Sequence, residues 1–317
     1  MTNTMTPLLP RRSLWLAALA ALAVACTVAE PRTDSAPPVA APPPTADPAA
    51  LERARAFQLE LDRELREDDR SFLTVVAAYY LAPGEQLKLA RFNGSWGPPA
   101  KADDAAQLSF EATPEQLLVT GIREATVRET TLIPLGDGDG DGEDSRFAVA
   151  ISPQSESWRV QIHDRDAELR ASFPGVAWFP IDGAVIVTAR FEPSPTREGV
   201  LLQTSRGLTK TLYVVGEAHF EINGQALSLQ AFGYAPTATP NEPLLIPFRD
   251  QTSGHQSYAA GRYLELQAPT GTALELDFNR ATNPLCAYSE HFNCPVPPRN
   301  NTLEVAIRAG AGSPTAH

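Results

Sequence analysis

The polar side chains best able to bind or react with a small molecule gather near the C-terminus, between residues 247 and 301. A guanidinium group donates several hydrogen bonds in a fixed fork and pairs with carboxylate and phosphate groups. Guanidinium groups beside tyrosine and asparagine side chains therefore favour a small anionic or carbonyl-bearing ligand. The predicted ligand-binding residues are Arg249, Asp250, Tyr258, Arg262, Asp277, Asn279, Arg280, Asn283 and Tyr288. We expect them to line a pocket beside the loop between Cys286 and Cys294.

The same segment allows two other interpretations. A hydrolase would use Asp250 or Asp277 as general base, or Ser253 as nucleophile. Alternatively, the polar residues form a network that only stabilises a loop-rich fold. Ser253 lies outside any Gly-x-Ser-x-Gly elbow, so the sequence leaves open whether the protein is an enzyme. No phosphate-binding loop, paired-histidine zinc helix or dinucleotide fingerprint occurs, so no cofactor is predicted.

Strand alternation predicts which of these side chains pair. Arg262 would share a strand face with Leu264, and an unpaired buried charge costs on the order of several kcal/mol. Asp250 is the expected partner. Further along, a strand whose leucines face the core would leave Asp277 and Asn279 facing a cleft or solvent.

Cys286 and Cys294 lie in a segment without apolar periodicity, from residue 280 to 301. A loop of this length is usually functional or tied down internally. Outside the cytoplasm a disulfide is the favoured interpretation. Free or redox-active thiols are the second, and a metal site is the third, because His291 is the only nearby further ligand.

The N-terminus resembles a lipoprotein signal peptide. Arg11 and Arg12 precede an apolar run from Leu14 to Val24, which is too short to span a bilayer as a helix. The run ends at Ala25-Cys26, which resembles a lipobox, so Cys26 is the predicted lipidation site. Ordinary secretory cleavage near Ala25 is the alternative, and the sequence does not decide between general and twin-arginine export.

The expected location follows from that resemblance. Thr27 follows the cysteine where an aspartate would favour retention in the inner membrane. We therefore expect a lipid-anchored protein of the cell envelope, on the periplasmic side of the outer membrane. Residues 26–50 form a Pro/Ala-rich tether, and its extended conformation would hold a domain away from the bilayer.

The fold is predicted to be mostly β, with one N-terminal amphipathic helix and two β-rich subdomains like sandwiches or barrels. Apolar residues recur every three or four positions from Leu51 to Leu65, which predicts the helix. Short strands separated by turns follow. The predicted regions are a signal peptide (1–25), the tether (26–50), the helix with the first β subdomain (51–165), the second β subdomain (166–310) and a tail (311–317).

The first β subdomain resembles a forkhead-associated β-sandwich in its strand spacing and in its turns at Gly84 and Asn93-Gly94. The arginine and serine set that binds phosphothreonine is not evident, so the resemblance implies no phosphopeptide binding. Within this subdomain, residues Asp137 to Gly142 resemble the start of an EF-hand loop. The twelfth position is Ala148 instead of an acid, so a hairpin turn is favoured over weak calcium binding.

The C-terminal part resembles a prokaryotic family of unknown function, domain of unknown function number 1684. The strings that carry the resemblance are Phe248-Arg249-Asp250, Thr252-Ser253-Gly254, Tyr258, Gly261-Arg262-Tyr263-Leu264, Leu276-Asp277-Phe278-Asn279-Arg280-Ala281, Asn283-Pro284, Cys286-Ala287-Tyr288-Ser289, Asn293-Cys294-Pro295 and Pro297-Pro298. The resemblance implies no activity, so the residues above rest on their own chemistry.

Composition excludes one class of partner. The chain of 317 residues has a formal charge of −12 at pH 7, which repels nucleic-acid phosphates. The expected partners are therefore the membrane, through the lipid on Cys26, and a small molecule. The sequence identifies no protein partner.

Overall fold

The computed structural model describes residues 47–99, 106–136, 145–154 and 156–314. Residues 43–317 form one unit by their contacts. The predicted signal peptide, Cys26, the tether up to residue 46 and the Asp137–Gly142 segment lie outside the described residues. None of the described helices is both long and apolar enough to cross a membrane.

The long helix α1 spans Pro48–Glu67 and begins three residues before the predicted start. The Asp47 carboxylate accepts a hydrogen bond from the backbone N–H of Ala49, and Pro48 occupies the first turn, where its missing N–H costs nothing. The helix ends at Glu67 and is followed by the short 3₁₀ turn Phe72–Thr74. Its inner face buries Ala50, Ala54 and Leu65.

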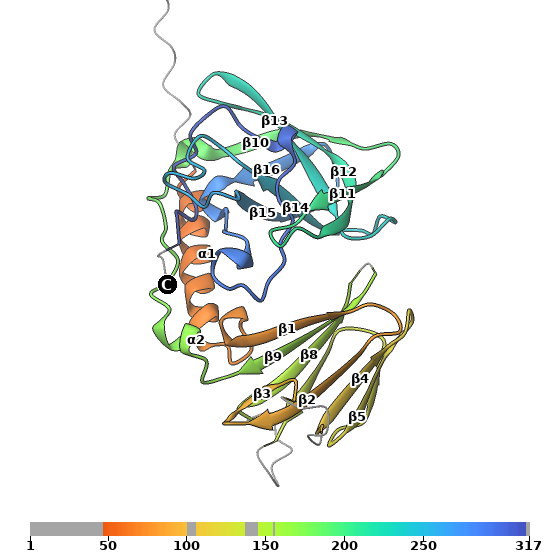
Figure 1. Ribbon diagram of the computed structural model, residues 1–317. Coiled ribbons are helices and arrows are strands. Elements are labelled where there is room, and N and C mark those ends of the chain that lie inside the picture. Colours follow the sequence, from red (N-terminus) through yellow and green to blue (C-terminus); the bar gives the residue numbers. More distant parts are fainter. Residues whose placement is uncertain (1–46, 100–105, 137–144, 155, 315–317) are drawn as a thin grey trace, which may run out of the picture. The chain divides into compact units, whose positions relative to one another are not determined.

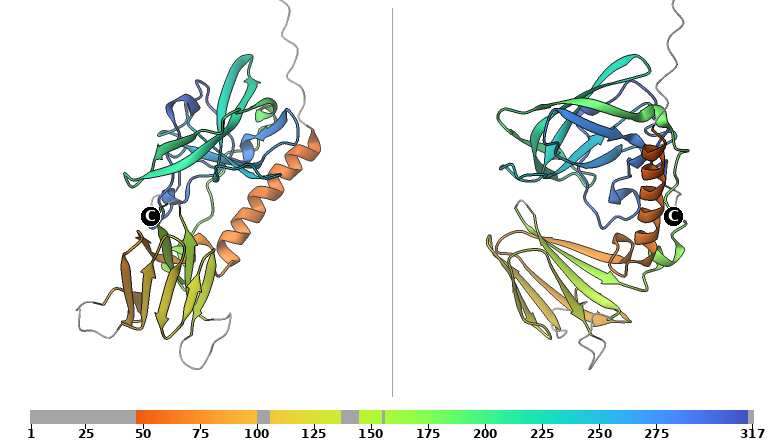
Figure 2. Two further views of the ribbon diagram at one scale, coloured as in Figure 1. Left: turned by 90° about the vertical axis from the view of Figure 1, so that its right-hand side faces the viewer. Right: turned by 180° about the vertical axis from the view of Figure 1, so that it is seen from behind.

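The first β subdomain contains two antiparallel sheets (Figures 1 and 2), and their buried side chains form one apolar core. The four-stranded sheet has the order β1 (Val75–Leu81), β9 (Trp158–Asp164), β8 (Phe147–Pro153) and β7 (Thr131–Leu135). The five-stranded sheet has the order β3 (Ser95–Gly97), β2 (Gln86–Phe92), β4 (Leu108–Ala112), β5 (Leu117–Gly121) and β6 (Ala125–Val127). Alternating side chains of both sheets, such as Phe110 and Phe147, fill the space between them.

The second β subdomain is built on a seven-stranded antiparallel sheet. Its order is β15 (Arg262–Gln267), β14 (Pro243–Phe248), β13 (Gln225–Gly233), β12 (Thr209–Ile222), β10 (Ile186–Pro193) and β16 (Ala273–Asp277), and β11 (Gly199–Gln203) pairs with β12. One face carries a core that includes Phe220, Phe248 and Phe278. The other face carries a smaller cluster that includes Leu212, Leu245 and Tyr263. Both faces are therefore apolar, and the second must be covered.

The predicted fold class is confirmed: the chain is mostly β, with two β-rich subdomains and one long N-terminal helix. The forkhead-associated resemblance stays a prediction. Sequence periodicity did not indicate the five-residue helix α2, Glu168–Ser172, which follows β9. Short 3₁₀ turns at Gly183–Val185, Phe278–Arg280, Leu285–Ala287 and Arg299–Asn301 complete the described helical segments.

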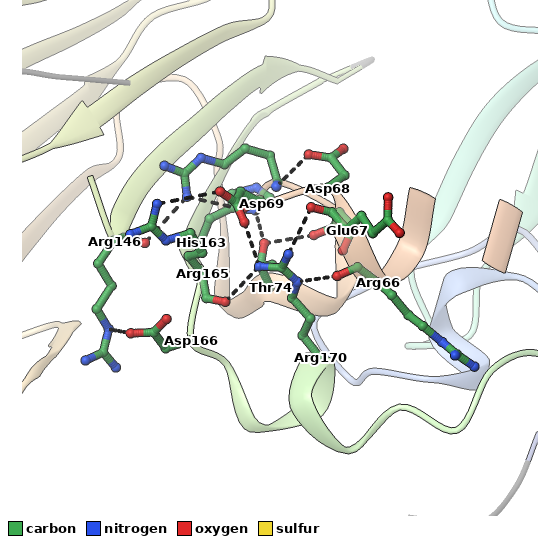
Figure 3. Close-up of polar contacts among 12 residues, drawn as sticks. Arg66, Glu67, Asp68, Asp69, Thr74, Arg146, His163, Arg165, Asp166 and Arg170 are labelled. Atoms are coloured by element: carbon green, nitrogen blue, oxygen red, sulfur yellow. Dashed lines mark hydrogen bonds and ion pairs between the residues drawn. The ribbon is translucent and has the colours of Figure 1, made fainter. Parts of the chain in front are cut away.

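A polar network joins the end of α1 to α2 and to β9 (Figure 3). The Arg170 guanidinium donates to the carbonyl oxygens of Arg66 and Glu67 at 2.8 and 3.0 Å, and to the Asp69 carboxylate at 2.8 Å. It thereby satisfies carbonyls that the last turn of a helix leaves without partners. In the same network, Nδ1 of the buried His163 lies 2.7 Å from Oγ1 of Thr74.

The tautomer of His163 follows from this geometry. The Thr74 hydroxyl donates to the carbonyl of Ser71 at 2.8 Å, so its oxygen accepts from His163 and the histidine proton lies on Nδ1. Burial and the nearby Arg70 charge lower the pKa of His163 to about 4. The imidazole is therefore neutral at pH 7.

Candidate functional site

Arg262 and Asp250 form a buried ion pair, as strand alternation predicts. Nη2 of Arg262 lies 2.7 Å from Oδ2 of Asp250, and both side chains are fully shielded from solvent. The guanidinium also donates to the carbonyls of Ile307 and Ala311 at 2.9 and 3.1 Å, and to that of Ala309. Because its terminal nitrogens are used within the chain, Arg262 is not available to a ligand.

Both carboxylate oxygens of Asp250 likewise accept hydrogen bonds from within the chain. Its Oδ1 accepts from the backbone N–H and hydroxyl of Thr252 at 2.9 and 2.6 Å, and Oδ2 also accepts from the N–H of Ile307 at 3.0 Å. Ser253 donates to Oδ1 at 3.4 Å and accepts from the Asp250 N–H at 3.1 Å. A carboxylate held by this many donors is a poor general base, so this geometry does not support a hydrolase built on Asp250 and Ser253.

Asp277 and Asn279 are buried, which corrects the expectation that they face a cleft or solvent. The strand ends at Asp277 and the chain turns into Phe278–Arg280, so the two-residue alternation stops there. Asp277 caps this turn by accepting from the N–H and side-chain amide of Asn279 at 3.0 and 2.9 Å. The Asn279 amide also bonds both backbone groups of Asp182, at 2.8 and 2.9 Å. Burial raises the pKa of Asp277.

A cavity of about 580 Å³ lies between α1, the smaller apolar face of the seven-stranded sheet and the loop that follows Arg280. Of the nine predicted ligand-binding residues, Arg280, Asn283 and Tyr288 line it, and Cys294 of the predicted disulfide does too. Its apolar wall includes Phe57, Leu61, Leu65, Phe72, Leu245, Tyr263 and Phe292. The cavity is therefore beside the cysteine loop, as expected, but α1 supplies a wall that the sequence pattern did not indicate.

Arg280 is the cation of the predicted set that reaches this cavity. Its guanidinium lies over the ring of Phe57, with Cζ 4.7 Å from the ring centroid. Nε of Arg280 is buried and has no hydrogen-bond partner, and no described carboxylate lies within ion-pair distance of this arginine. The charge of Arg280 offsets part of the rise that burial causes in the pKa of Asp277, but this carboxylate lies beyond ion-pair distance. A cation on an aromatic face that forms no direct ion pair is able to receive an anion.

Asn283 adds a second unsatisfied group to the cavity wall. Its amide nitrogen donates to the carbonyl of Gly312 at 2.8 Å and to the hydroxyl of Tyr288 at 3.1 Å. The Gly312 carbonyl accepts only from the NH₂ group, which sets the orientation of the amide. The buried Oδ1 is left without a donor, which is unusual for a buried acceptor.

Three charged residues of the cavity wall were not predicted from the sequence: Arg159, Lys210 and Glu265. Lys210 shares a strand face with the buried Leu212, and its Nζ lies 5.5 Å from the ring centroid of Tyr234. Burial, followed by the charge of Arg159, lowers the pKa of Lys210. The side chain of Glu265 is exposed to water within the cavity, but the surrounding protein removes part of the water around its carboxyl group and so raises the pKa of that group. A charged residue in phase with buried apolar neighbours was the available signal for Lys210 and Glu265.

The remaining predicted residues lie elsewhere. Arg249 is next to the buried ion pair and does not line the cavity, and its Nε has no partner. Tyr258 does not line the cavity, and burial, followed by the charge of the neighbouring Cys286, raises the pKa of its phenol to about 12. The cavity thus contains only three of the nine predicted residues, and its wall also includes residues from α1, β9 and β12.

Cys286 and Cys294 are free thiols, so the disulfide that the sequence favours is not formed here. The backbone N–H of Cys286 donates to Sγ of Cys294 at 3.3 Å, so the two residues lie next to each other. In the part of the chain that the structure describes, no cluster of three or more His, Cys, Asp or Glu residues could hold a metal ion.

Comparisons with known proteins place the C-terminal half in a family without an assigned activity. Residues 171–312 match the model of a family described as "Protein of unknown function (DUF1684)". The chain is also similar to the solution NMR structure of an uncharacterized protein of Haloarcula marismortui, with 39% identity, 47% of this chain and 82% of that chain covered, and a TM-score of 0.40. No curated protein matches the chain.

Proposed function

Residues 171–312 of this chain belong to the DUF1684 family of proteins of unknown function, and from that premise we propose that the protein binds a small molecule with an anionic group and an apolar body. The ligand occupies the cavity between α1 and the seven-stranded sheet. The anionic group pairs with Arg280, and the apolar body contacts the aromatic and aliphatic wall.

The observation that carries the proposal is the unpaired Arg280 guanidinium over Phe57. This protein has more acids than bases, so carboxylates are abundant partners for a structural arginine. The buried Arg262 has such a partner and Arg280 does not. A half-buried cation that forms no direct ion pair in a mostly apolar cavity favours an anion that arrives from outside.

The dimensions and walls of the cavity indicate the rest of the ligand. About 580 Å³ lies within the range of small-molecule pockets, which are mostly apolar with a few polar groups that orient the ligand. Asn283 Oδ1 is an unused acceptor in this wall, so a hydroxyl or N–H near the anionic group would bind better than a plain hydrocarbon there. A carboxylate on an aliphatic or aromatic body fits these features.

Calorimetric titration with three probes of equal chain length tests the proposal: dodecanoate, dodecanol and dodecyltrimethylammonium. We expect dodecanoate to bind the tightest, because its carboxylate alone pairs with Arg280. Loss of a hydrogen bond to a charged group costs about 1.5–3 kcal/mol, so Arg280→Met should weaken dodecanoate binding by about 10- to 150-fold and leave dodecanol unchanged.

Arg308→Met is the matched control, because Arg308 is exposed, bonds Gln256 and does not line the cavity. It should bind dodecanoate like the wild type. Equal binding of dodecanol and dodecanoate to the wild type, or equal dodecanoate affinity in the Arg280→Met variant, would refute the assignment.

We also propose that the protein is a lipoprotein of the cell envelope, anchored through Cys26 and facing the periplasm from the outer membrane. The lipobox-like Leu22-Ala23-Val24-Ala25-Cys26 supports this, together with the Pro/Ala-rich stretch before α1. Full-length protein should incorporate labelled palmitate and sediment with outer membranes. Cys26→Ala should do neither. Label retained by that variant would exclude Cys26 as the anchor.

A further inference from the structure

The two cysteines form a close pair on a loop that is tied to the β11–β12 hairpin. The N–H of Ser205 donates to the carbonyl of Cys294 at 2.9 Å, and the N–H of Cys294 donates to the Ser205 hydroxyl at 3.2 Å. Arg206 donates to the carbonyl of Glu290 at 3.0 Å. These bonds hold the middle and the Cys294 end of the loop, and the backbone N–H of Cys286 donates to Sγ of Cys294 at 3.3 Å, which keeps the two residues adjacent.

The two thiols have different surroundings. Cys294 is 9% exposed, lies in the apolar cluster with Leu212 and Tyr263, and lines the cavity. Cys286 is half-buried, and the neighbouring Cys294 thiol and the hydroxyls of Ser205 and Tyr258 lower the pKa of its thiol to about 6. Polar hydrogens near a sulfur stabilise its thiolate.

From this arrangement we propose that Cys286 and Cys294 are a redox-active dithiol that exchanges with disulfides, with Cys286 as the attacking thiol. The oxidant is a small-molecule or protein disulfide, RS–SR′. The Cys286 thiolate attacks one sulfur, the S–S bond breaks, and RS⁻ leaves as a mixed disulfide forms on Cys286. The Cys294 thiol then loses its proton and attacks Cys286, and R′S⁻ leaves.

The electrons and protons balance in this sequence. Two protein thiols are oxidised to one disulfide, and one external disulfide is reduced to two thiols. The hydrogen bond from the Cys294 thiol to Cys286 lowers the pKa of Cys286 to about 6, and the same contact raises the pKa of Cys294. Cys286 therefore carries the thiolate at neutral pH, and Cys294, which stays protonated until the mixed disulfide forms, acts second.

This inference is independent of the ligand proposed for the cavity. It also differs from a structural disulfide, which would form once and stay closed. A reversible couple is favoured by the half-buried position of Cys286, which lets an external disulfide reach it, and by the hydrogen bond from its backbone N–H to Sγ of Cys294, which holds the reduced pair together.

The test uses the full chain with Cys26→Ala, so that only the pair reports. Folded protein is incubated with mixtures of reduced and oxidised glutathione, quenched with acid and weighed by mass spectrometry. We expect reversible loss of two hydrogen atoms as the mixture becomes oxidising. Cys294→Ser should stop at one glutathione on Cys286, and Cys286→Ser should react at least about tenfold more slowly.

Alkylation of the Cys294→Ser and wild-type chains by iodoacetamide adds a second readout. In the wild type the rate at which Cys286 is alkylated should rise with pH, with a midpoint near pH 6. In case a variant fails to fold, short quench times with the wild type followed by peptide mapping identify which cysteine carries the first glutathione. A first adduct on Cys294, or a disulfide that forms only in urea, would overturn the proposal.

Discussion

Replacement of Arg262 by methionine tests whether the most buried of the predicted ligand-binding residues is structural. Methionine has a similar length and keeps apolar contact with the rings of Phe248 and Phe179. The centroids of these rings lie 5.3 and 5.8 Å from Cζ of Arg262. It removes the charge and the hydrogen bonds. Asp250 then stays buried without its cation, and the carbonyls of Ile307, Ala309 and Ala311 lose a donor.

Removal of one partner from a buried ion pair usually costs about 3–5 kcal/mol, because the remaining charge is uncompensated. The lost carbonyl partners act in the same direction, so we expect the free energy of unfolding to fall by about 4 kcal/mol. The double variant Arg262→Met/Asp250→Asn removes the orphaned charge. It should recover about 1–3 kcal/mol relative to the sum of the single changes.

Urea unfolding followed by tryptophan fluorescence measures these values, with the slope m as a check that the unfolded state is unchanged. Arg249→Met is the control, since Arg249 is the sequence neighbour of Asp250 and forms no ion pair among the described residues. It should cost less than about 1 kcal/mol. A loss below about 1 kcal/mol for Arg262→Met, or an equal loss for both variants, would refute the structural role.

Three further predictions concern stability. The pKa of His163 is lowered from 6.5 to about 4, so between these pH values the unfolded chain binds more protons than the folded chain. The free energy of unfolding should therefore fall by on the order of 3 kcal/mol on acidification from pH 7 to 4. In urea titrations over this pH range, His163→Gln should reduce that pH dependence. Gly310→Ala should lower the melting temperature by several degrees, because φ is +73° and a Cβ would lie 2.6 Å from two carbonyl oxygens, whereas Gly271→Ala, with nothing within 4 Å, should not. Asn279→Ala should cost about 1–3 kcal/mol in urea unfolding, since the Asp182 backbone groups lose both partners; a loss below about 0.5 kcal/mol would contradict the importance of this contact.

Features that depend on local periodicity were predictable from the sequence. The alternation of short strands predicts the mostly β class, and the spacing of Leu51, Ala54 and Leu61 predicts α1. The pairing of Arg262 with Asp250 is also a local inference, because an arginine on an apolar strand face needs a carboxylate nearby in the chain. Each of these conclusions uses residues within one or two elements.

The cavity was not predictable in this way, because its walls come from distant segments. Phe57 on α1 lies over Arg280, more than two hundred positions later in the chain, and no spacing rule connects them. Lys210 and Arg159 reach the same cavity from β12 and β9. The misplacement of Asp277 has a simpler cause: the strand ends at that residue, and alternation no longer applies beyond it.

The central claim is that Arg280 pairs with the anionic group of a bound ligand. The ¹H–¹⁵N resonance of Arg280 Nε, assigned by its loss in Arg280→Met, reports on this directly. As dodecanoate is added, we expect a large shift of this resonance that saturates with the calorimetric affinity, and no comparable shift with dodecanol. A resonance that stays in place while dodecanoate binds would contradict the claim.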